Sequence, residues 1–141
     1  MSKEARSDKT HVRNRTYPGK YTIGSWQSLA ASDAQKVIKE EVIATQRVMV
    51  VRCGYKPGSD FKPHVHRREQ LTIVESGTLE FVINGNTVAV GPGQMISIFP
   101  GVLHGTRITG EKPVRALNIF YSCTDVPAVL QAPTLAKLSR I

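Results

Sequence analysis

From Gln46 onward the sequence alternates short apolar runs with turn residues, and this pattern constrains the fold more than any other feature. Turn chemistries such as Asn84-Gly85 separate the runs, and no helical pattern intervenes. Seven runs rich in Val, Ile, Phe and Thr are predicted to be strands: residues 46–55, 70–75, 78–83, 87–90, 95–99, 105–109 and 114–121. Short strands at a spacing of roughly 8–12 residues predict an all-β sandwich or barrel.

Before Gln46 and after Ser122 the pattern is weaker. Residues 21–32 suit short edge strands or an arm that covers the barrel. The window 32–43 opens with residues that could cap a helix, but its β-branched side chains favour a strand. Residues 126–141 are expected to pack as a short C-terminal tail.

The length of 141 residues fits one domain with its own core. We expect a basic N-terminal arm over residues 1–20 and a single domain over residues 21–141. The arm holds six basic and two acidic residues, which is half of the net charge of +8. A basic arm could grip phosphate groups, but no aromatic or helix-turn-helix context accompanies it. We therefore favour a solvated terminus and expect no nucleic-acid partner.

Localisation and redox state follow from what the sequence lacks. No apolar run approaches the ~20 residues of a membrane span, and no apolar segment follows the basic N-terminus. These features predict a cytoplasmic protein without a membrane partner. Cys53 and Cys123 lack the CxxC spacing of a zinc or redox site, so buried free thiols are favoured over a disulfide or a metal-binding role.

The segment from Gly58 to His104 holds the candidate ligands. His64 and His66 are one residue apart on an extended segment, so their side chains point the same way, and Gln70 shares their parity. His104 can join them if a later strand folds back over the first. Three or four potential ligands would then share one face.

These residues resemble the two sequence motifs of the cupin superfamily over residues 46–121. The first motif matches at Gly58, His64, His66 and Gly77, with Gln70 at its glutamate position. The second motif matches at Gly93, Gly101 and His104, with Phe99 at its proline and Ile108 at its asparagine position. The resemblance implies a double-stranded β-helix (jelly-roll) barrel that holds a metal and tends to form a homodimer.

With that resemblance, three of the four histidines occupy ligand positions, and neutral imidazole is a common ligand of divalent transition ions. We predict a metal site formed by His64, His66 and His104, with the amide oxygen of Gln70 as the fourth ligand. Glu69 is the competing candidate, but it has the opposite strand parity and is expected to point outward. Mn, Fe, Co, Ni, Cu and Zn all accept such a site.

One branch of the family resembles this chain more closely. The spacing of the histidines and the Glu69-Gln70 pair are similar to those of small bacterial cupins that ketonise unsaturated uronates. In that branch an Asp and an Arg act on the substrate, whereas this chain has Asn118 and Thr124. Phe120 matches the branch. Candidate substrate-pocket residues are therefore Asn118 and Phe120, with Arg52 as a possible carboxylate clamp.

Neutral donors shape the functional prediction. Three imidazoles and an amide add no negative charge, so a divalent ion would keep its full charge and act as a Lewis acid. We predict a metal-dependent cupin enzyme with lyase or isomerase chemistry on a small, anionic, carboxylated or sugar-derived substrate. The alternatives are a non-catalytic ligand-binding or sensing cupin and a cupin dioxygenase.

The same strand pattern predicts which side chains fill the barrel. Twelve apolar residues are expected in the core: Val48, Val50, Val74, Leu79, Phe81, Ile83, Val88, Val90, Ile96, Ile98, Leu117 and Ile119.

Overall fold

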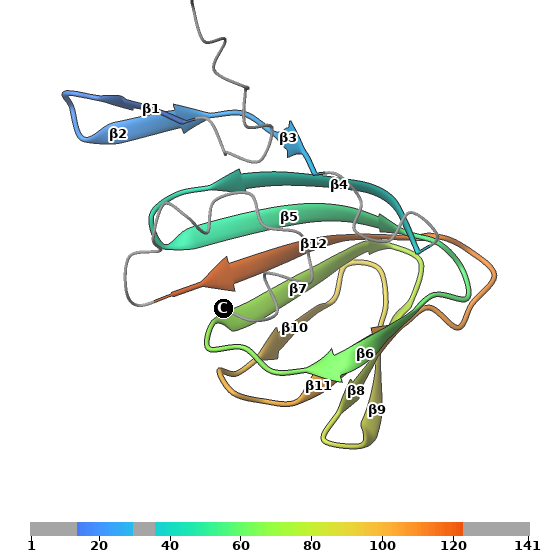
Figure 1. Ribbon diagram of the computed structural model, residues 1–141. Coiled ribbons are helices and arrows are strands. Elements are labelled where there is room, and N and C mark those ends of the chain that lie inside the picture. Colours follow the sequence, from blue (N-terminus) through green and yellow to red (C-terminus); the bar gives the residue numbers. More distant parts are fainter. Residues whose placement is uncertain (1–13, 30–35, 123–141) are drawn as a thin grey trace, which may run out of the picture.

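The computed structural model describes residues 14–29 and 36–122 (Figure 1). The regular secondary structure of these residues consists of β-strands alone. Residues 1–13 of the expected arm, the expected C-terminal tail and Cys123 lie outside the described residues. In the described part, no helix is long and apolar enough to cross a membrane. The strands are β1 (Asn14–Tyr17), β2 (Tyr21–Gly24), β3 (Gln27–Ser28), β4 (Val37–Ala44), β5 (Val48–Tyr55), β6 (Asp60–His64), β7 (Glu69–Ser76), β8 (Leu79–Ile83), β9 (Asn86–Val90), β10 (Met95–Ile98), β11 (His104–Arg107) and β12 (Val114–Tyr121).

Two antiparallel sheets form the body of the molecule. The larger sheet has the order β10-β7-β12-β5-β4-β3, and the smaller one has the order β6-β11-β8-β9. From β5 to β8 the chain crosses from one sheet to the other at every connection, and it does so again from β9 to β12 (Figure 1). This winding is the predicted double-stranded β-helix, so the fold prediction is confirmed.

The seven predicted strands correspond to β5 and β7 through β12, with ends shifted by one or two residues. The window 32–43 is a strand from Val37 onward, as its β-branched residues indicated. Strand β6 is absent from the seven runs because Asp60, Lys62 and Pro63 interrupt its apolar pattern. It pairs with β11 all the same, since a ladder depends on backbone groups more than on side-chain polarity.

Turn chemistry sets two hairpins. Asn84 and Gly85 both have positive φ angles, of 48° and 82°, and join β8 to β9 as the Asn-Gly signal predicted. A separate two-stranded hairpin, β1–β2, turns at Pro18 to Lys20. The side-chain amide of Asn14 in this hairpin donates a hydrogen bond to the carbonyl of Ala44 in β4. The domain boundary expected at residue 20 therefore falls in a turn between two paired strands.

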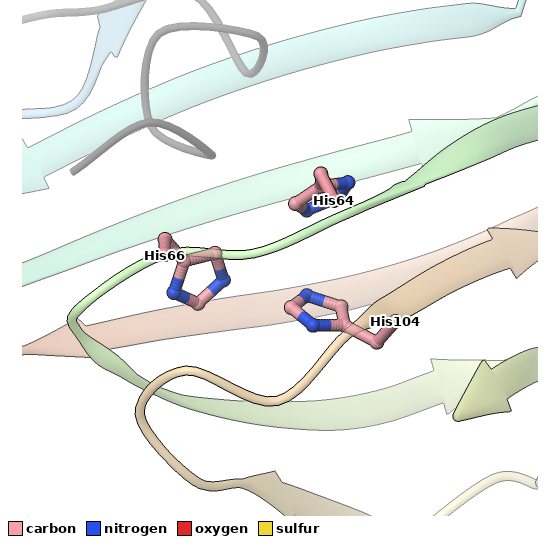
Figure 2. Close-up of side chains that lie close together, drawn as sticks. All are labelled: His64, His66 and His104. Carbon is pink, nitrogen blue, oxygen red and sulfur yellow. The ribbon is translucent and has the colours of Figure 1, made fainter. Parts of the chain in front are cut away.

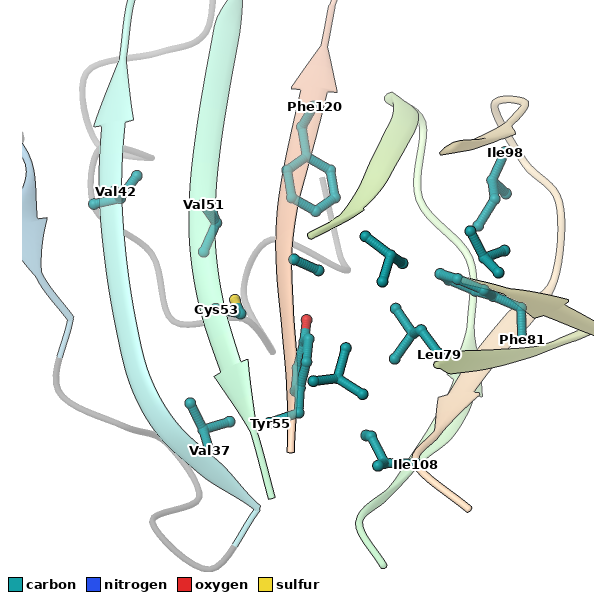
Figure 3. Packing of buried hydrophobic residues seen from close by; sticks show 14 of the residues in the cluster. Val37, Val42, Val51, Cys53, Tyr55, Leu79, Phe81, Ile98, Ile108 and Phe120 are labelled. Atoms are coloured by element: carbon teal, nitrogen blue, oxygen red, sulfur yellow. The ribbon is translucent and has the colours of Figure 1, made fainter. Parts of the chain in front are cut away.

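Apolar side chains fill the space between the two sheets (Figure 3). Five predicted core residues are buried: Val74, Leu79, Phe81, Val90 and Ile98. Ile83 and Ile96 pack against this core from partly buried positions. Val88 is instead 41% exposed, on the strand β9 at the edge of its sheet.

The predicted core face was wrong for two central strands. In β5 the buried residues begin at Met49 and Val51, so Val48 and Val50 face the other way. In β12 the buried set includes Ala116 and Phe120, and Leu117 and Ile119 are only half-buried. Both faces of these strands carry apolar residues, so alternation alone could not choose between them.

The interior also contains a buried carboxyl group. Glu40 in β4 is 2% exposed, and in the part of the chain that the structure describes neither of its carboxyl oxygens has a hydrogen-bond partner. Its strand neighbour across the ladder is Cys53 in β5. Burial raises the pKa of Glu40 to about 7. Burial, followed by the charge of Glu40, raises the pKa of the Cys53 thiol to about 12.

The raised pKa of Glu40 predicts a pH-dependent stability. The folded state binds this proton more tightly than the unfolded state, so the contribution is most favourable below pH 4.5 and is lost as the pH rises towards 7. A shift from 4.5 to about 7 corresponds to about 3 kcal/mol. We expect Glu40→Gln to gain about that much stability relative to the wild type between pH 4.5 and pH 8.

Urea unfolding of the wild type and Glu40→Gln, in buffers that contain a metal chelator, gives the free energy of unfolding of each protein at several pH values and so checks this prediction. All other side chains are the same in both proteins, so their effect on stability cancels in the difference. A stability difference that does not change with pH would show that the pKa of Glu40 is the same in the folded and unfolded states, which would contradict the prediction.

Candidate metal centre

His104 meets two histidines from an earlier part of the chain, His64 and His66 (Figure 2). His64 is the last residue of β6, His66 lies in the connection that follows, and His104 is the first residue of β11. The centroids of the His64 and His104 rings are 4.5 Å apart, and those of His66 and His104 are 4.9 Å apart. One potential ligand atom from each ring lies within 4.8 Å of the others.

Close approach of two backbones brings His104 to His64. These two residues face each other in the antiparallel pair of β6 and β11, where the register shifts. A Cβ atom on Gly105 would lie 2.9 Å from the carbonyl oxygen of Phe61 in β6. Only glycine fits there without displacing backbone. A further hydrogen bond, from the Gly101 N–H to the His66 carbonyl, ties the loop before His104 to the second histidine.

Each imidazole is oriented by a backbone carbonyl. The Nδ1 atoms of His64, His66 and His104 lie 3.0, 2.8 and 2.8 Å from the carbonyl oxygens of Lys62, Arg68 and Val102. A carbonyl oxygen only accepts, so each Nδ1 carries the proton and donates it. In the neutral rings each Nε2 then keeps its lone pair, which is the form that binds metals.

Gln70 presents an oxygen to two of these lone pairs. Its Oε1 atom lies 3.1 Å from Nε2 of His66 and 3.1 Å from Nε2 of His104. The orientation of the amide follows from its other end, because Nε2 of Gln70 donates to the hydroxyl of Thr72 at 2.9 Å. That hydroxyl donates to Oδ1 of Asn118 at 2.8 Å, and Nδ2 of Asn118 donates to the hydroxyl of Tyr55 at 2.9 Å.

Burial keeps the buried imidazoles neutral. His66 is 4% exposed and His104 is 1% exposed, whereas His64 is half-buried. Burial lowers the pKa of His104 to about 4, and it is also the main cause of the lowered pKa of His66. Near neutral pH the rings of His66 and His104 are therefore neutral and offer lone pairs. Lone pairs that are buried together favour the binding of a cation.

The structure brings Gln70 to the histidines by a different route from the expected one. The expectation was one extended segment carrying His64, His66 and Gln70 on the same face. Instead β6 ends at His64, the chain bends at residues 67 and 68, and Gln70 belongs to β7 in the larger sheet. Glu69 points away from the cluster and accepts a hydrogen bond from Ser97 in β10 at 2.8 Å.

The expected pocket residues are divided between two faces. Phe120 is buried beside the cluster, with its ring centroid 5.6 Å from that of His66. Asn118 is also buried, but both ends of its amide are taken up by Thr72 and Tyr55. Arg52 does not join them. It lies on the opposite face of β5, donates to Glu41 at 2.9 Å and stacks on Trp26, so the carboxylate that Arg52 binds in this structure belongs to the protein itself.

Two residues of this region were missed at the level of sequence. Thr72 is fully buried and links Gln70 to Asn118. Arg68 is 2% exposed, and its main-chain carbonyl holds His66. Both share the parity of Gln70, which was the only available signal, and neither residue type is a usual metal ligand.

Comparisons with known proteins agree with this geometry. A family model described as a cupin domain matches residues 51–120. No curated protein sequence matches the chain significantly.

Solved structures share the fold. KdgF from Halomonas sp. is 21% identical with a TM-score of 0.59, over 69% of this chain and 84% of that one. An uncharacterised protein with a double-stranded β-helix domain from Klebsiella pneumoniae is 27% identical with a TM-score of 0.56, over 66% and 82%. Oxalate decarboxylase from Bacillus subtilis, which has Mn(II) centres, is 16% identical with a TM-score of 0.58, over 70% of this chain but only 28% of the enzyme. The region matched by the family model contains strands β6 to β11, the three histidines and Gln70, and the chain therefore belongs to the cupin superfamily.

Proposed function

We propose that this cupin is a metal-dependent enzyme that binds one divalent transition ion through His64, His66, His104 and Oε1 of Gln70. The observation that carries this proposal is the convergence of electron-pair donors without a hydrogen-bond donor among them. Each Nδ1 is used by a backbone carbonyl, and the Gln70 amide is turned by Thr72 so that its oxygen faces the rings. Mn, Fe, Co, Ni, Cu and Zn all suit nitrogen and oxygen donors of this kind.

The neutral donor set supports Lewis-acid chemistry. A divalent ion held there would supply an electrophilic centre that polarises a substrate oxygen. The chain itself orients the imidazoles, and Phe120 packs an apolar edge against His66. His64 is the least buried of the three histidines, so a substrate would approach from its side. A small oxygenated substrate with a carboxylate or sugar-derived skeleton would complement the full positive charge of a divalent ion held by neutral donors. Such an ion suits lyase or isomerase chemistry better than dioxygenation.

A non-catalytic ligand-binding or sensing role is the second candidate. The candidate ligand group contains no carboxyl side chain among the described residues. Asn118 stands where the uronate-ketonising branch has an acid, and an amide is no general base near neutral pH. A barrel with this site could therefore hold an anion without converting it. We further propose a cytoplasmic homodimer, as the family resemblance and the sequence composition suggested.

Metal content tests the ligand set. We expect wild-type protein purified without an affinity tag to hold about one equivalent of metal, and His104→Ala to hold less than about a fifth of that. Glu69→Ala is the matched control, because Glu69 lies beside Gln70 but faces Ser97. Elemental analysis measures all three proteins. Wild-type metal content in His104→Ala, or equal losses in both variants, would contradict the ligand set.

The orientation of Gln70 can be tested through Thr72. Thr72→Val keeps the side-chain shape but removes the hydroxyl that accepts from Gln70 and donates to Asn118. We expect the metal affinity to fall by about 10- to 100-fold. Thr72→Ser keeps the hydroxyl and should stay close to the wild type. Competition with a fluorescent chelator gives the affinities, and equal affinities for the Val and Ser variants would rule out this role of the hydroxyl.

A substrate screen tests the enzyme proposal itself. Protein loaded with each candidate metal is incubated with unsaturated uronates, keto acids and diketones, and products are followed by NMR. We expect conversion of at least one carboxylated compound without oxygen consumption, and loss of conversion in His104→Ala. Binding without conversion for every metal would favour the sensing role, whereas oxygen uptake coupled to product would favour a dioxygenase.

A further inference from the structure

Arg68 has a buried guanidinium group that no described residue pairs with. The residue is 2% exposed, and its Nε, Nη1 and Nη2 atoms have no hydrogen-bond acceptor within residues 14–29 and 36–122. Two other arginines of the described chain behave differently: Arg52 is paired with Glu41, and Arg107 is paired with Glu80. Buried charges in proteins are normally paired, because desolvation without compensation is costly. The missing acceptor at Arg68 therefore calls for an anion from outside the described chain.

Arg68 is placed beside the metal centre by its own backbone. Its carbonyl oxygen accepts the hydrogen bond from Nδ1 of His66, and Gln70 follows two residues later. Along this stretch Arg67 is exposed, Arg68 is buried, Glu69 is half-buried and Gln70 is buried. Arg68 and Gln70 are thus the two residues of this segment that turn into the protein.

The nearest acidic side chain in the sequence does not neutralise Arg68. Glu69 is directed to β10, where its carboxylate accepts from Ser97. The metal ligands cannot neutralise it either, since three imidazoles and an amide carry no negative charge. The positive charge of the Arg68 guanidinium would therefore add to the positive charge of a bound divalent ion.

We propose that Arg68 is a carboxylate-binding residue, and that the protein takes a small organic acid whose carboxylate pairs with the guanidinium while another of its oxygens faces the three histidines. The planar fork of guanidinium N–H groups matches the two oxygens of a carboxylate. A neutral ligand of the same shape would leave the buried charge unpaired. Arg68 thereby selects acids over neutral sugars and alcohols.

The assignment rests on the proposed function for the idea of a metal-bound substrate oxygen, but carboxylate binding itself requires no turnover. Malonate and D-galacturonate serve as acidic probes, and D-galactose serves as the neutral counterpart of the uronate. Calorimetric titrations use the full chain, both metal-loaded and chelator-treated. Metal content, measured separately, shows whether a failure lies in the metal site or at Arg68.

The variants are Arg68→Met and, as a matched control, Arg67→Met. Both remove one positive charge from adjacent positions, but Arg67 is exposed. We expect at least one acidic probe to bind the wild type, Arg68→Met to weaken that binding by about 30-fold or more, and Arg67→Met to change it by less than about threefold. D-galactose should bind equally weakly to all three proteins. Arg68→Lys keeps the charge without the fork and should fall in between.

The thermal unfolding temperature is a second measurement, which distinguishes lost carboxylate binding from poor folding of Arg68→Met. An unpaired buried charge gives little stability, so in anion-free buffer Arg68→Met should unfold at the wild-type temperature or above it. Malonate should raise the unfolding temperature of the wild type and Arg67→Met but not that of Arg68→Met. A lower unfolding temperature or loss of metal in Arg68→Met would assign the residue a structural role instead. Failure of both acids to bind the wild type, or equal weakening in the two Met variants, would also overturn the proposal.

Discussion

The site depends on one electrostatic constraint, which is that buried lone pairs from three imidazoles and one amide point at each other. Such an arrangement is unfavourable by itself, and the surrounding hydrogen bonds hold it in place. Carbonyls within two residues of each histidine fix the rings, and Thr72 fixes the amide of Gln70. A bound cation turns this repulsion into attraction, so the same contacts that orient the donors also prepare a metal site.

The parts of the fold that could be predicted are those encoded locally. Asn84 and Gly85 both adopt the positive φ angles that a two-residue hairpin turn requires, and this preference is local. Runs of Val and Ile between turns likewise favour strands. The three histidines could be grouped because their spacing resembles a family motif, whereas parity alone assumed a strand that in fact ends at His64. The correct grouping was therefore reached with a partly wrong local geometry.

The parts that could not be predicted depend on neighbours far along the chain. Arg52 and Arg68 look alike in the sequence, but Arg52 lies opposite Glu41 across the β4–β5 ladder and Arg68 has no such neighbour. The buried face of β12 was similarly undetermined, because either parity offers apolar side chains. Strand register decides both cases, and register is a property of the whole sheet.

The two amide side chains near the centre, Asn118 and Gln70, can be explained by the charge that a carboxylate would add at either position. Asn118 accepts from Thr72 and donates to Tyr55, so both ends of its amide are used without adding charge. An ionised carboxylate at this position could still accept from Thr72, but it would bring a buried negative charge towards the centre. At position 70 a carboxylate would place a negative charge against the rings of His66 and His104, where the Gln70 amide oxygen now lies. With amides at both positions, the positive charges of a bound divalent ion and of Arg68 would be left to the ligand. Under the proposal made above, the absence of negative charge from these two side chains would favour anions over neutral ligands.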